Sequence, residues 1–103
     1  MALRPRHKYN AKPTKRDGHH FPSKKEAGFY DQLVRLQAAG DVLFFLRQVP
    51  FHLPGGIKAV VDFVVFYTDG QVRIFDVKGV RTASFIRNKK QVEHYYPVEV
   101  EEV

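Results

Sequence analysis

Hydrophobic and polar positions along the chain follow a helical period first and the pattern of strands afterwards. Apolar side chains recur every three or four positions from Ala27 through Tyr30 to Leu33, which predicts an amphipathic helix from about residue 24 to 39. Gly40 suits the left-handed position at which helices end. The first half of the chain is therefore predicted to contain one well-delimited helix.

Apolar runs after this helix predict strands. The run at 42–53 is strand-like, and Pro50 places part of it at a sheet edge or a bend. Two further runs, at about 57–67 and 71–78, are joined by a Thr-Asp-Gly connection. This connection suits a tight hairpin with Gly70 at positive φ.

The last part of the chain predicts a second helix and a final strand. Thr82 or Ser84 would cap a helix from Phe85 to about Tyr95, and alternation from residue 98 predicts a strand. The order of elements is thus α-β-β-β-α-β. This order predicts an α/β domain with a mixed central sheet flanked by helices.

Basic residues are concentrated at the start of the chain. The formal net charge is +6, and residues 1–25 hold eight Lys or Arg against one acid, so residues 26–103 are close to neutral. Residues 1–20 have little apolar periodicity and are predicted to form a basic flexible arm before a domain at 21–103. Such an arm suits the phosphates of a nucleic acid, and a solubilising tail is the alternative.

Composition excludes several classes of protein. The chain has no cysteine, which excludes a disulfide framework and a thiolate metal site. No apolar run is long enough to span a membrane, and the first residues lack the apolar core of a signal peptide. We therefore expect a soluble intracellular protein with no membrane partner.

Three charged side chains interrupt the apolar hairpin. Positions i and i+2 of a strand share a face, so Asp76 and Lys78 project together, and Asp62 can meet them from the neighbouring strand. Carboxylates are the ligands that Mg²⁺ or Mn²⁺ prefers, which makes Asp62, Asp76 and the backbone carbonyl of Val77 candidate ligands. Lys78 would orient a water or stabilise the transition state of phosphodiester hydrolysis. A simple salt bridge between Asp76 and Lys78 is the alternative.

Glu26 has two competing interpretations. The sequence Ser23-Lys-Lys-Glu26 is a capping box, in which the glutamate side chain is engaged at the start of the helix. Glu26 also lies on the core-facing side of the helix, from which it could reach the metal or a metal-bound water. A side chain used in the cap can hardly also bind a metal.

Together these residues resemble the PD-(D/E)xK nuclease superfamily. The resemblance rests on Asp62, a spacer of thirteen residues, the tripeptide Asp76-Val77-Lys78, and Glu26 on a preceding helix. It covers residues 21–103 and implies a restriction-endonuclease-like core with Mg²⁺ or Mn²⁺ as cofactor. The catalytic set that it implies is Glu26, Asp62, Asp76 and Lys78.

Further similarities narrow the expected function. The segments Phe21–Ala27 and Gln48-x-x-Phe51 are similar to small phage-encoded nucleases, and the size and basic start resemble archaeal-type Holliday junction resolvases. The resemblance implies a structure-selective DNA endonuclease, foremost a homodimeric resolvase of four-way junctions in the cytoplasm of a bacterium or phage-infected cell. Two departures are Val61 in place of a common proline and Asp76 where resolvases usually have glutamate. Alternatives are a nicking, flap or restriction-type nuclease, or a non-catalytic DNA-binding module.

The remaining candidate residues concern DNA contacts and the dimer. Gln91-x-x-x-Tyr95 spans one helical turn and resembles an element of exonuclease-like members, with a packed amphipathic helix as the alternative. Together with Ser23 these are the accessory candidates. Phe44-Phe45 and the terminal strand are candidates for the dimer interface. The expected phosphate contacts are Arg4, Arg6, Lys8, Lys12, Lys15, Arg16, Lys24, Lys89 and Lys90.

Overall fold

The structure is a computed structural model that describes residues 14–77 and 80–103. No helix in these two ranges is long and apolar enough to cross a membrane. In chain order the elements are β1 (Thr14–Arg16), β2 (His19–Phe21), α1 (Lys24–Ala38), β3 (Val42–Leu53), β4 (Ile57–Tyr67), β5 (Val72–Asp76), α2 (Ala83–Tyr95) and β6 (Val100–Glu102).

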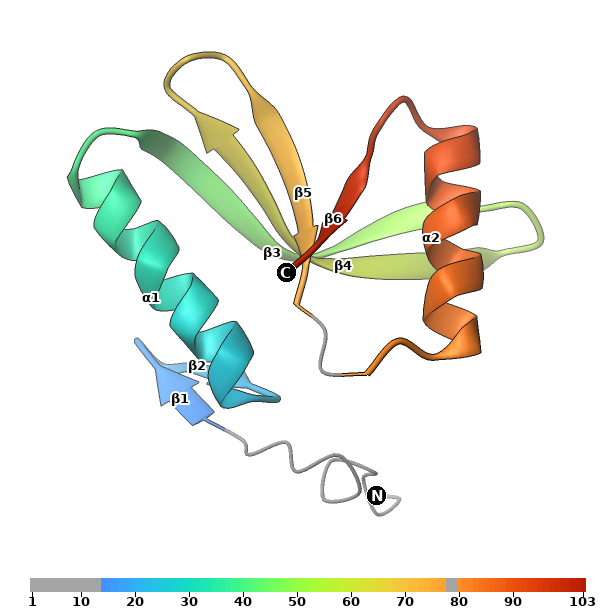
Figure 1. Ribbon diagram of the computed structural model, residues 1–103, viewed down its shortest axis with the longest axis horizontal. Coiled ribbons are helices and arrows are strands. Elements are labelled where there is room, and N and C mark those ends of the chain that lie inside the picture. The colour runs from blue at the N-terminus through green and yellow to red at the C-terminus, as the bar shows by residue number, and fades with distance from the viewer. Residues whose placement is uncertain (1–13, 78–79) are drawn as a thin grey trace.

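The main sheet has four strands in the order β3-β4-β5-β6 (Figure 1). The first three strands are antiparallel neighbours, and β6 runs parallel to β5 after a crossover through α2. Val103, just after β6, donates its N–H to the carbonyl of Asp76 at 3.0 Å. The predicted α/β architecture with a mixed sheet and two helices is therefore confirmed.

The predicted start and end of the first helix are also confirmed. The Ser23 hydroxyl accepts the N–H of Glu26 at 3.1 Å, which caps the start of α1. At the other end Gly40 has φ +88°. Its N–H and that of Asp41 donate to carbonyls of the last turn, which is a Schellman motif.

The strands that carry the site form a long, bent hairpin. β3 is an edge strand, which accommodates Pro50 because proline has no N–H to donate. Figure 1 shows β3 and β4 bending together, so that one half of the hairpin lies toward α1 and its loop lies beside α2. The predicted turn before β5 is present, with Gly70 at φ +93°. The second helix begins after Thr82, whose hydroxyl accepts the N–H of Phe85.

The buried apolar side chains form two hydrophobic cores. One core packs under α1 and includes Phe63 and Val65, whereas the other packs under α2 and includes Val61 and Val64. Asp62 lies between Val61 and Phe63, which belong to different cores. The polar centre of the molecule is thus placed at the seam of the two cores.

The prediction of a flexible arm over residues 1–20 is wrong for residues 14–20. These residues belong to the β1–β2 hairpin, whose turn Asp17-Gly18 has positive φ at both positions. Asp-Gly is a preferred two-residue hairpin turn, so the signal was present in the sequence. The high density of charged residues around this turn favoured the prediction of a flexible arm. Residues 1–13 lie outside the described part of the chain.

The hairpin is fastened to α1 by polar contacts and by burial. Arg16 forms an ion pair with Asp31 at 3.0 Å, and the hydroxyl of Tyr30 donates to Asp17 at 3.0 Å. Phe21, at the end of β2, is 1% exposed and belongs to the core under α1. Arg16 is therefore held against that helix.

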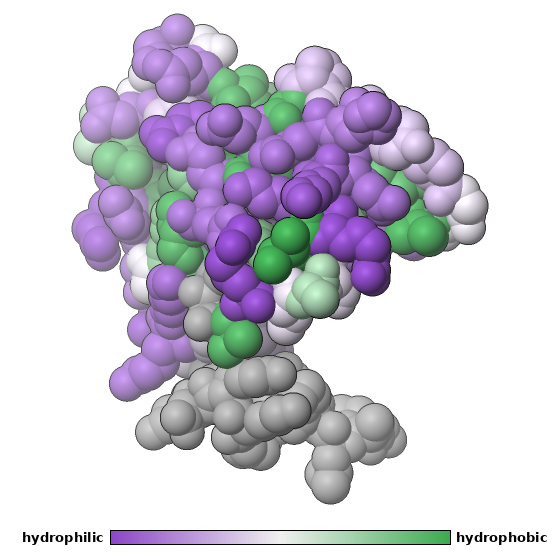
Figure 2. Space-filling model, turned by 45° about the vertical axis from the view of Figure 1, so that its right-hand side comes forward, coloured by the Kyte–Doolittle hydropathy of each residue, from purple (hydrophilic) through white to green (hydrophobic). Residues whose placement is uncertain are grey.

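Some apolar side chains remain at the surface near the start of β3. Phe44 and Leu46 are each 45% exposed, and Val72 is 53% exposed. Phe44 stacks on Phe66 with ring centroids 4.3 Å apart, and Val72 pairs with Phe66 on the next strand. Figure 2 shows one face of the molecule, on which hydrophobic side chains lie in small groups between hydrophilic ones.

Replacing Phe63 by alanine tests the role of the core under α1. Phe63 is 0% exposed, so Phe63→Ala should lower the free energy of unfolding by about 3–5 kcal/mol. The matched control is Phe44→Ala, which removes an exposed ring and should cost about 1 kcal/mol. Urea unfolding followed by circular dichroism measures both. Equal losses in the two variants would contradict the assignment of the core.

Candidate active site

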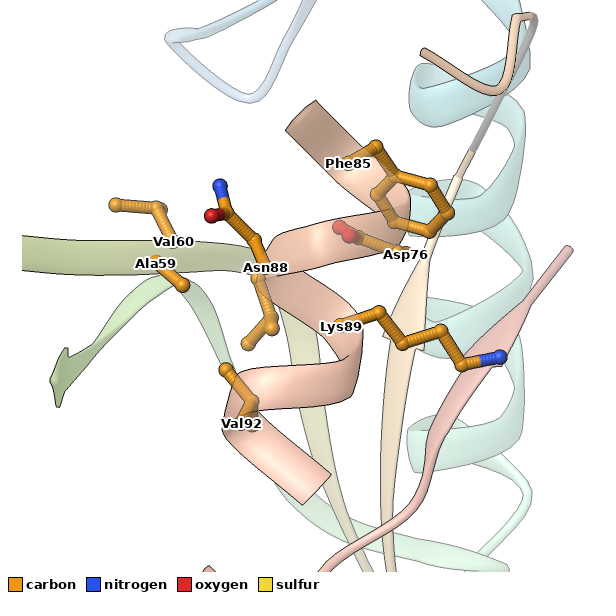
Figure 3. A pocket seen from close by; sticks show the side chains of 8 residues that line it. Ala59, Val60, Asp76, Phe85, Asn88, Lys89 and Val92 are labelled. Atoms are coloured by element: carbon orange, nitrogen blue, oxygen red, sulfur yellow. The ribbon is translucent and has the colours of Figure 1, made fainter. Parts of the chain in front are cut away.

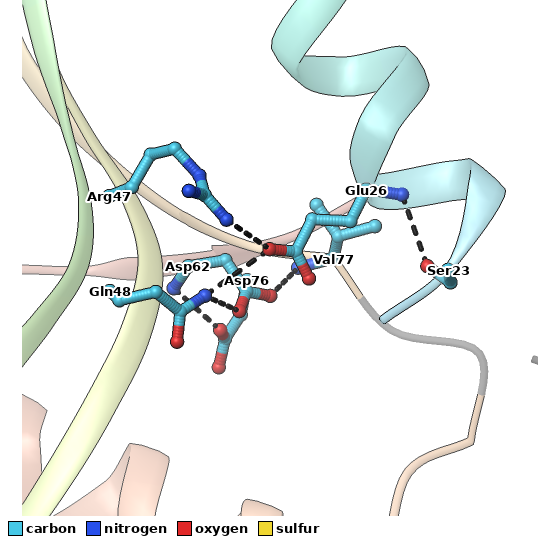
Figure 4. A network of polar contacts seen from close by, with 7 residues as sticks. All are labelled: Ser23, Glu26, Arg47, Gln48, Asp62, Asp76 and Val77. Atoms are coloured by element: carbon cyan, nitrogen blue, oxygen red, sulfur yellow. Dashed lines mark hydrogen bonds and ion pairs between the residues drawn. The ribbon is translucent and has the colours of Figure 1, made fainter. Parts of the chain in front are cut away.

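Asp62 of β4 and Asp76 of β5 are linked by hydrogen bonds from backbone N–H groups to their carboxylates (Figure 4). Asp76 Oδ1 accepts the N–H of Asp62 at 3.1 Å, and Asp62 Oδ2 accepts the N–H of Val77 at 2.8 Å. Asp76 is 5% exposed and Asp62 is half-buried. The predicted meeting of Asp62 and Asp76 is thus confirmed.

Glu26 joins this pair from the first turn of α1. Its backbone N–H donates to Ser23, whereas its carboxylate points toward the strands and is 3% exposed. Glu26 Oε2 accepts from the amide of Gln48 at 3.2 Å and lies 3.7 Å from a guanidinium nitrogen of Arg47. The cap and the site therefore use different atoms of Glu26, and the two interpretations no longer compete.

Gln48 is a site residue to which the sequence analysis gave no role. Its Nε2 donates to Glu26 Oε2 and to Asp62 Oδ1, both at 3.2 Å. Its φ of +53° places it in the left-handed region, which costs a residue with a side chain roughly 1–2 kcal/mol. Its signals in the sequence are a polar side chain within an apolar strand and its place in the Gln48-x-x-Phe51 segment that resembles phage-encoded nucleases.

Arg47 is the second residue that sequence reasoning missed. Its guanidinium lies over the ring of Phe21 at 4.0 Å from the centroid and faces Glu26. Its Nε is buried and has no hydrogen-bond partner. Arg47 brings a positive charge to the acids from the side of the β1–β2 hairpin.

Burial and neighbouring charges change the acidity of Glu26. Burial raises the pKa of Glu26 to about 7, and the negative charges of Asp62 and Asp76 add to this rise. The charge of Arg47 and the hydrogen bond from Gln48 act in the opposite direction. Near neutral pH Glu26 therefore exchanges its proton readily, as a general acid or base must.

The donor set suits a hard divalent cation in kind. Glu26, Asp62 and Asp76 supply carboxylate oxygens, and the hydrogen bonds through Gln48 and the backbone of Asp62 place them in one region. Within residues 14–77 and 80–103, however, no three Asp, Glu or His side chains are arranged to hold a metal ion as they stand. Gln48 occupies the position between two of the carboxylates. Val77 takes part in the site through its N–H, which donates to Asp62. A role for its carbonyl as a metal ligand stays a prediction.

A cavity of about 230 Å³ adjoins Asp76 between β4 and α2 (Figure 3). Phe85, Asn88 and Lys89 of α2 line it together with Asp76. The accessory candidates Gln91 and Tyr95 do not line this cavity, and Tyr95 is 53% exposed. The part of α2 that faces the acids is therefore nearer its start than predicted.

The predicted phosphate contacts are spread over several regions. Lys24 and Lys90 are exposed, Lys15 lies in β1, and Lys89 pairs with Glu102 at 3.1 Å. Arg16 is engaged with Asp31, as described above. Lys78 and the basic residues of the first thirteen positions, Arg4, Arg6, Lys8 and Lys12, lie outside the described residues.

Comparison with known proteins identifies a family without a known activity. A family model described as "Protein of unknown function (DUF1064)" matches residues 6–102. No curated protein and no solved structure shows a significant match to the chain.

The raised pKa of Glu26 predicts a pH dependence of stability. Because folding raises this pKa from 4.5 to about 7, its contribution is complete below about pH 4.5 and is lost as the pH rises through about 7. We expect the free energy of unfolding of metal-free protein to fall by roughly 3 kcal/mol over this range on account of Glu26. Glu26→Gln should abolish that part of the decrease.

Urea unfolding in the presence of a chelator, at about pH 5 and about pH 8, measures the effect. Glu99→Gln, at an exposed position, is the matched control and should follow the wild type. The same pH dependence in Glu26→Gln and wild type would contradict a buried, raised carboxyl.

Proposed function

The chain belongs to the DUF1064 family of proteins of unknown function, and we propose that it is a metal-dependent DNA endonuclease of the PD-(D/E)xK type. The observation that carries the proposal is the convergence of three carboxylates, Glu26, Asp62 and Asp76, from a helix and two adjacent strands. Burying several carboxylates together costs free energy unless a cation or another partner compensates their negative charge.

The mixed sheet supports the same proposal. Acids at the middle of β4 and the end of β5 lie beside a capped helix that supplies a third acid. We interpret this arrangement as a restriction-endonuclease-like core. The tripeptide Asp76-Val77-Lys78 begins at the last residue of β5, and the same tripeptide pattern occurs in the superfamily that the sequence resembles.

Each residue has a part in phosphodiester hydrolysis. Glu26, Asp62 and Asp76 would hold Mg²⁺ or Mn²⁺, which when bound neutralises charge on the phosphate and acidifies water. The pKa of about 7 belongs to Glu26 in the absence of the cation, and a bound cation would lower it and favour the ionised carboxylate. Lys78 follows Val77 directly and would orient the attacking water or stabilise the transition state.

The preferred substrate in this proposal is a four-way DNA junction cut by a homodimer. Two symmetric cuts require two sites, which a two-fold dimer supplies. Phe44 is 45% exposed and is a candidate for the interface, whereas Phe45 packs against Tyr30 and Phe63 inside the protomer. The terminal strand β6 forms the other edge of the sheet.

Substitution of the acid and the lysine tests the catalytic assignment. Asp76→Asn and Lys78→Ala should each reduce Mg²⁺-dependent cleavage by about a thousandfold or more, since both remove charge from the reacting centre. DNA binding should be retained. The measurement is cleavage of a labelled four-way junction beside a flap, a single strand and the matching linear duplex.

Asp69→Asn is the matched control, because it makes the same change in the turn of the same hairpin. It should cut like the wild type. Symmetric nicks confined to the junction support a resolvase, and cutting of another member of the panel favours the corresponding nuclease type. Undiminished cleavage by Asp76→Asn would refute the site.

The start of β1 at Thr14 defines how much of the basic arm can be removed to test its contact with DNA. Removing residues 2–13 leaves the β1–β2 hairpin intact and deletes four basic side chains, so junction affinity should fall. The slope of log affinity against log salt should become less steep by up to about 3.6, at about 0.9 for each charge. Fluorescence anisotropy over a salt series measures both. A variant with serine in place of these four residues, Arg4, Arg6, Lys8 and Lys12, should behave like the deletion, and an unchanged slope in it would exclude their contact with phosphate.

A further inference from the structure

Gln48 has a backbone conformation that a β-strand does not favour. Its neighbours Arg47 and Val49 pair regularly with Phe63 and Val61, so the left-handed φ of +53° is confined to the one residue opposite Asp62. Glycine is the residue that adopts this conformation most readily. A glutamine that keeps such a conformation beside a functional centre indicates that its side chain has a task there.

The side chain of Gln48 bridges two carboxylates with one nitrogen. Nε2 lies 3.2 Å from Glu26 Oε2 and 3.2 Å from Asp62 Oδ1, so these two oxygens lie at most about 6.4 Å apart, twice the hydrogen-bond length. The NH₂ group directs one hydrogen to each carboxylate. Its positive end thus stands between two negative groups, where a cation would also be attracted.

The other half of the amide has the opposite polarity and nearly the same shape. A rotation about the last side-chain bond exchanges Nε2 with the carbonyl oxygen and moves little else. Beside bare carboxylates only the NH₂ orientation is favourable, because the carbonyl oxygen would repel them. Beside a divalent cation the carbonyl orientation is favourable, since glutamine carbonyls are among the ligands of hard cations.

We propose that Gln48 is a further ligand of the divalent cation and that its amide turns when the cation binds. In the cation-free protein the NH₂ group holds Glu26 and Asp62 together. In the loaded protein the carbonyl oxygen faces Mg²⁺ or Mn²⁺. This inference rests on the proposed function for the presence of a cation, and it adds a role for Gln48 that a hydrogen-bonding spacer would not have.

Two substitutions separate this role from a structural one. In Gln48→Gly the relief of the positive φ offsets the two lost hydrogen bonds, so the melting temperature of the cation-free protein should change little, whereas Mn²⁺ affinity should fall roughly tenfold to a hundredfold. Gln48→Glu keeps the oxygen and adds charge, so Mn²⁺ affinity should rise roughly tenfold while the cation-free protein becomes less stable. Isothermal titration of Mn²⁺ and of Mg²⁺ into the protein without DNA measures affinity.

Gln71→Glu controls for added charge. Gln71 precedes β5, five residues from Asp76, or roughly 16 Å along the strand. This variant should bind Mn²⁺ as the wild type does. The side-chain amide signals of Gln48, assigned by their absence in Gln48→Gly, should also shift in ¹H–¹⁵N spectra when Mg²⁺ is added.

Each outcome decides the inference. Unchanged Mn²⁺ affinity in both Gln48 variants, or an amide signal that Mg²⁺ does not shift, overturns the role of Gln48. The proposed nuclease function stands in that case if the wild type binds the metal and cuts DNA. Tighter binding in Gln48→Gly shows that the amide only competes with the cation, which also overturns it. A wild type that binds neither Mn²⁺ nor Mg²⁺ and does not cut overturns both proposals.

Discussion

The structure depends on a reciprocal pair of hydrogen bonds between β4 and β5. The carboxylate of Asp76 accepts the N–H of Asp62, and the carboxylate of Asp62 accepts the N–H of Val77. These bonds satisfy backbone donors where the regular ladder between the two strands has ended beyond the pairing of Phe63 with Phe75. Each acid is therefore a structural part of the sheet and a member of the candidate site.

The position of this pair explains why a small domain can gather charge in its interior. The acids lie at the seam between two apolar cores, so each core excludes water from one side of them. Glu26 reaches the same seam from a helix whose start is held by Ser23. Arg47 and Gln48 offset part of the repulsion and so limit the rise of the pKa of Glu26 to about 7.

Most of the fold could be predicted because its elements carry local signals. The helix at 24–39 was delimited by its cap and by Gly40, and the strands by apolar runs between glycine turns. The β1–β2 hairpin was missed because high charge outweighed its Asp-Gly turn. In the site, Asp62 and Asp76 were predictable from strand alternation, since acids in apolar runs are conspicuous. The roles of Arg47 and Gln48 could not be predicted, because they depend on the bend of the strand and on the positive φ of Gln48, which the local sequence does not indicate.

The parallel pairing of β6 with β5 has a consequence for the order of folding. Parallel strands joined by a helix form contacts between distant parts of the chain, which form slowly compared with hairpins. Val103 holds the carbonyl of Asp76, so the backbone that carries this acid is fully fastened only when the end of the sheet has docked. The antiparallel strands β3, β4 and β5 can therefore pair first, and the backbone at Asp76 gains its last hydrogen bond only when β6 docks beside β5.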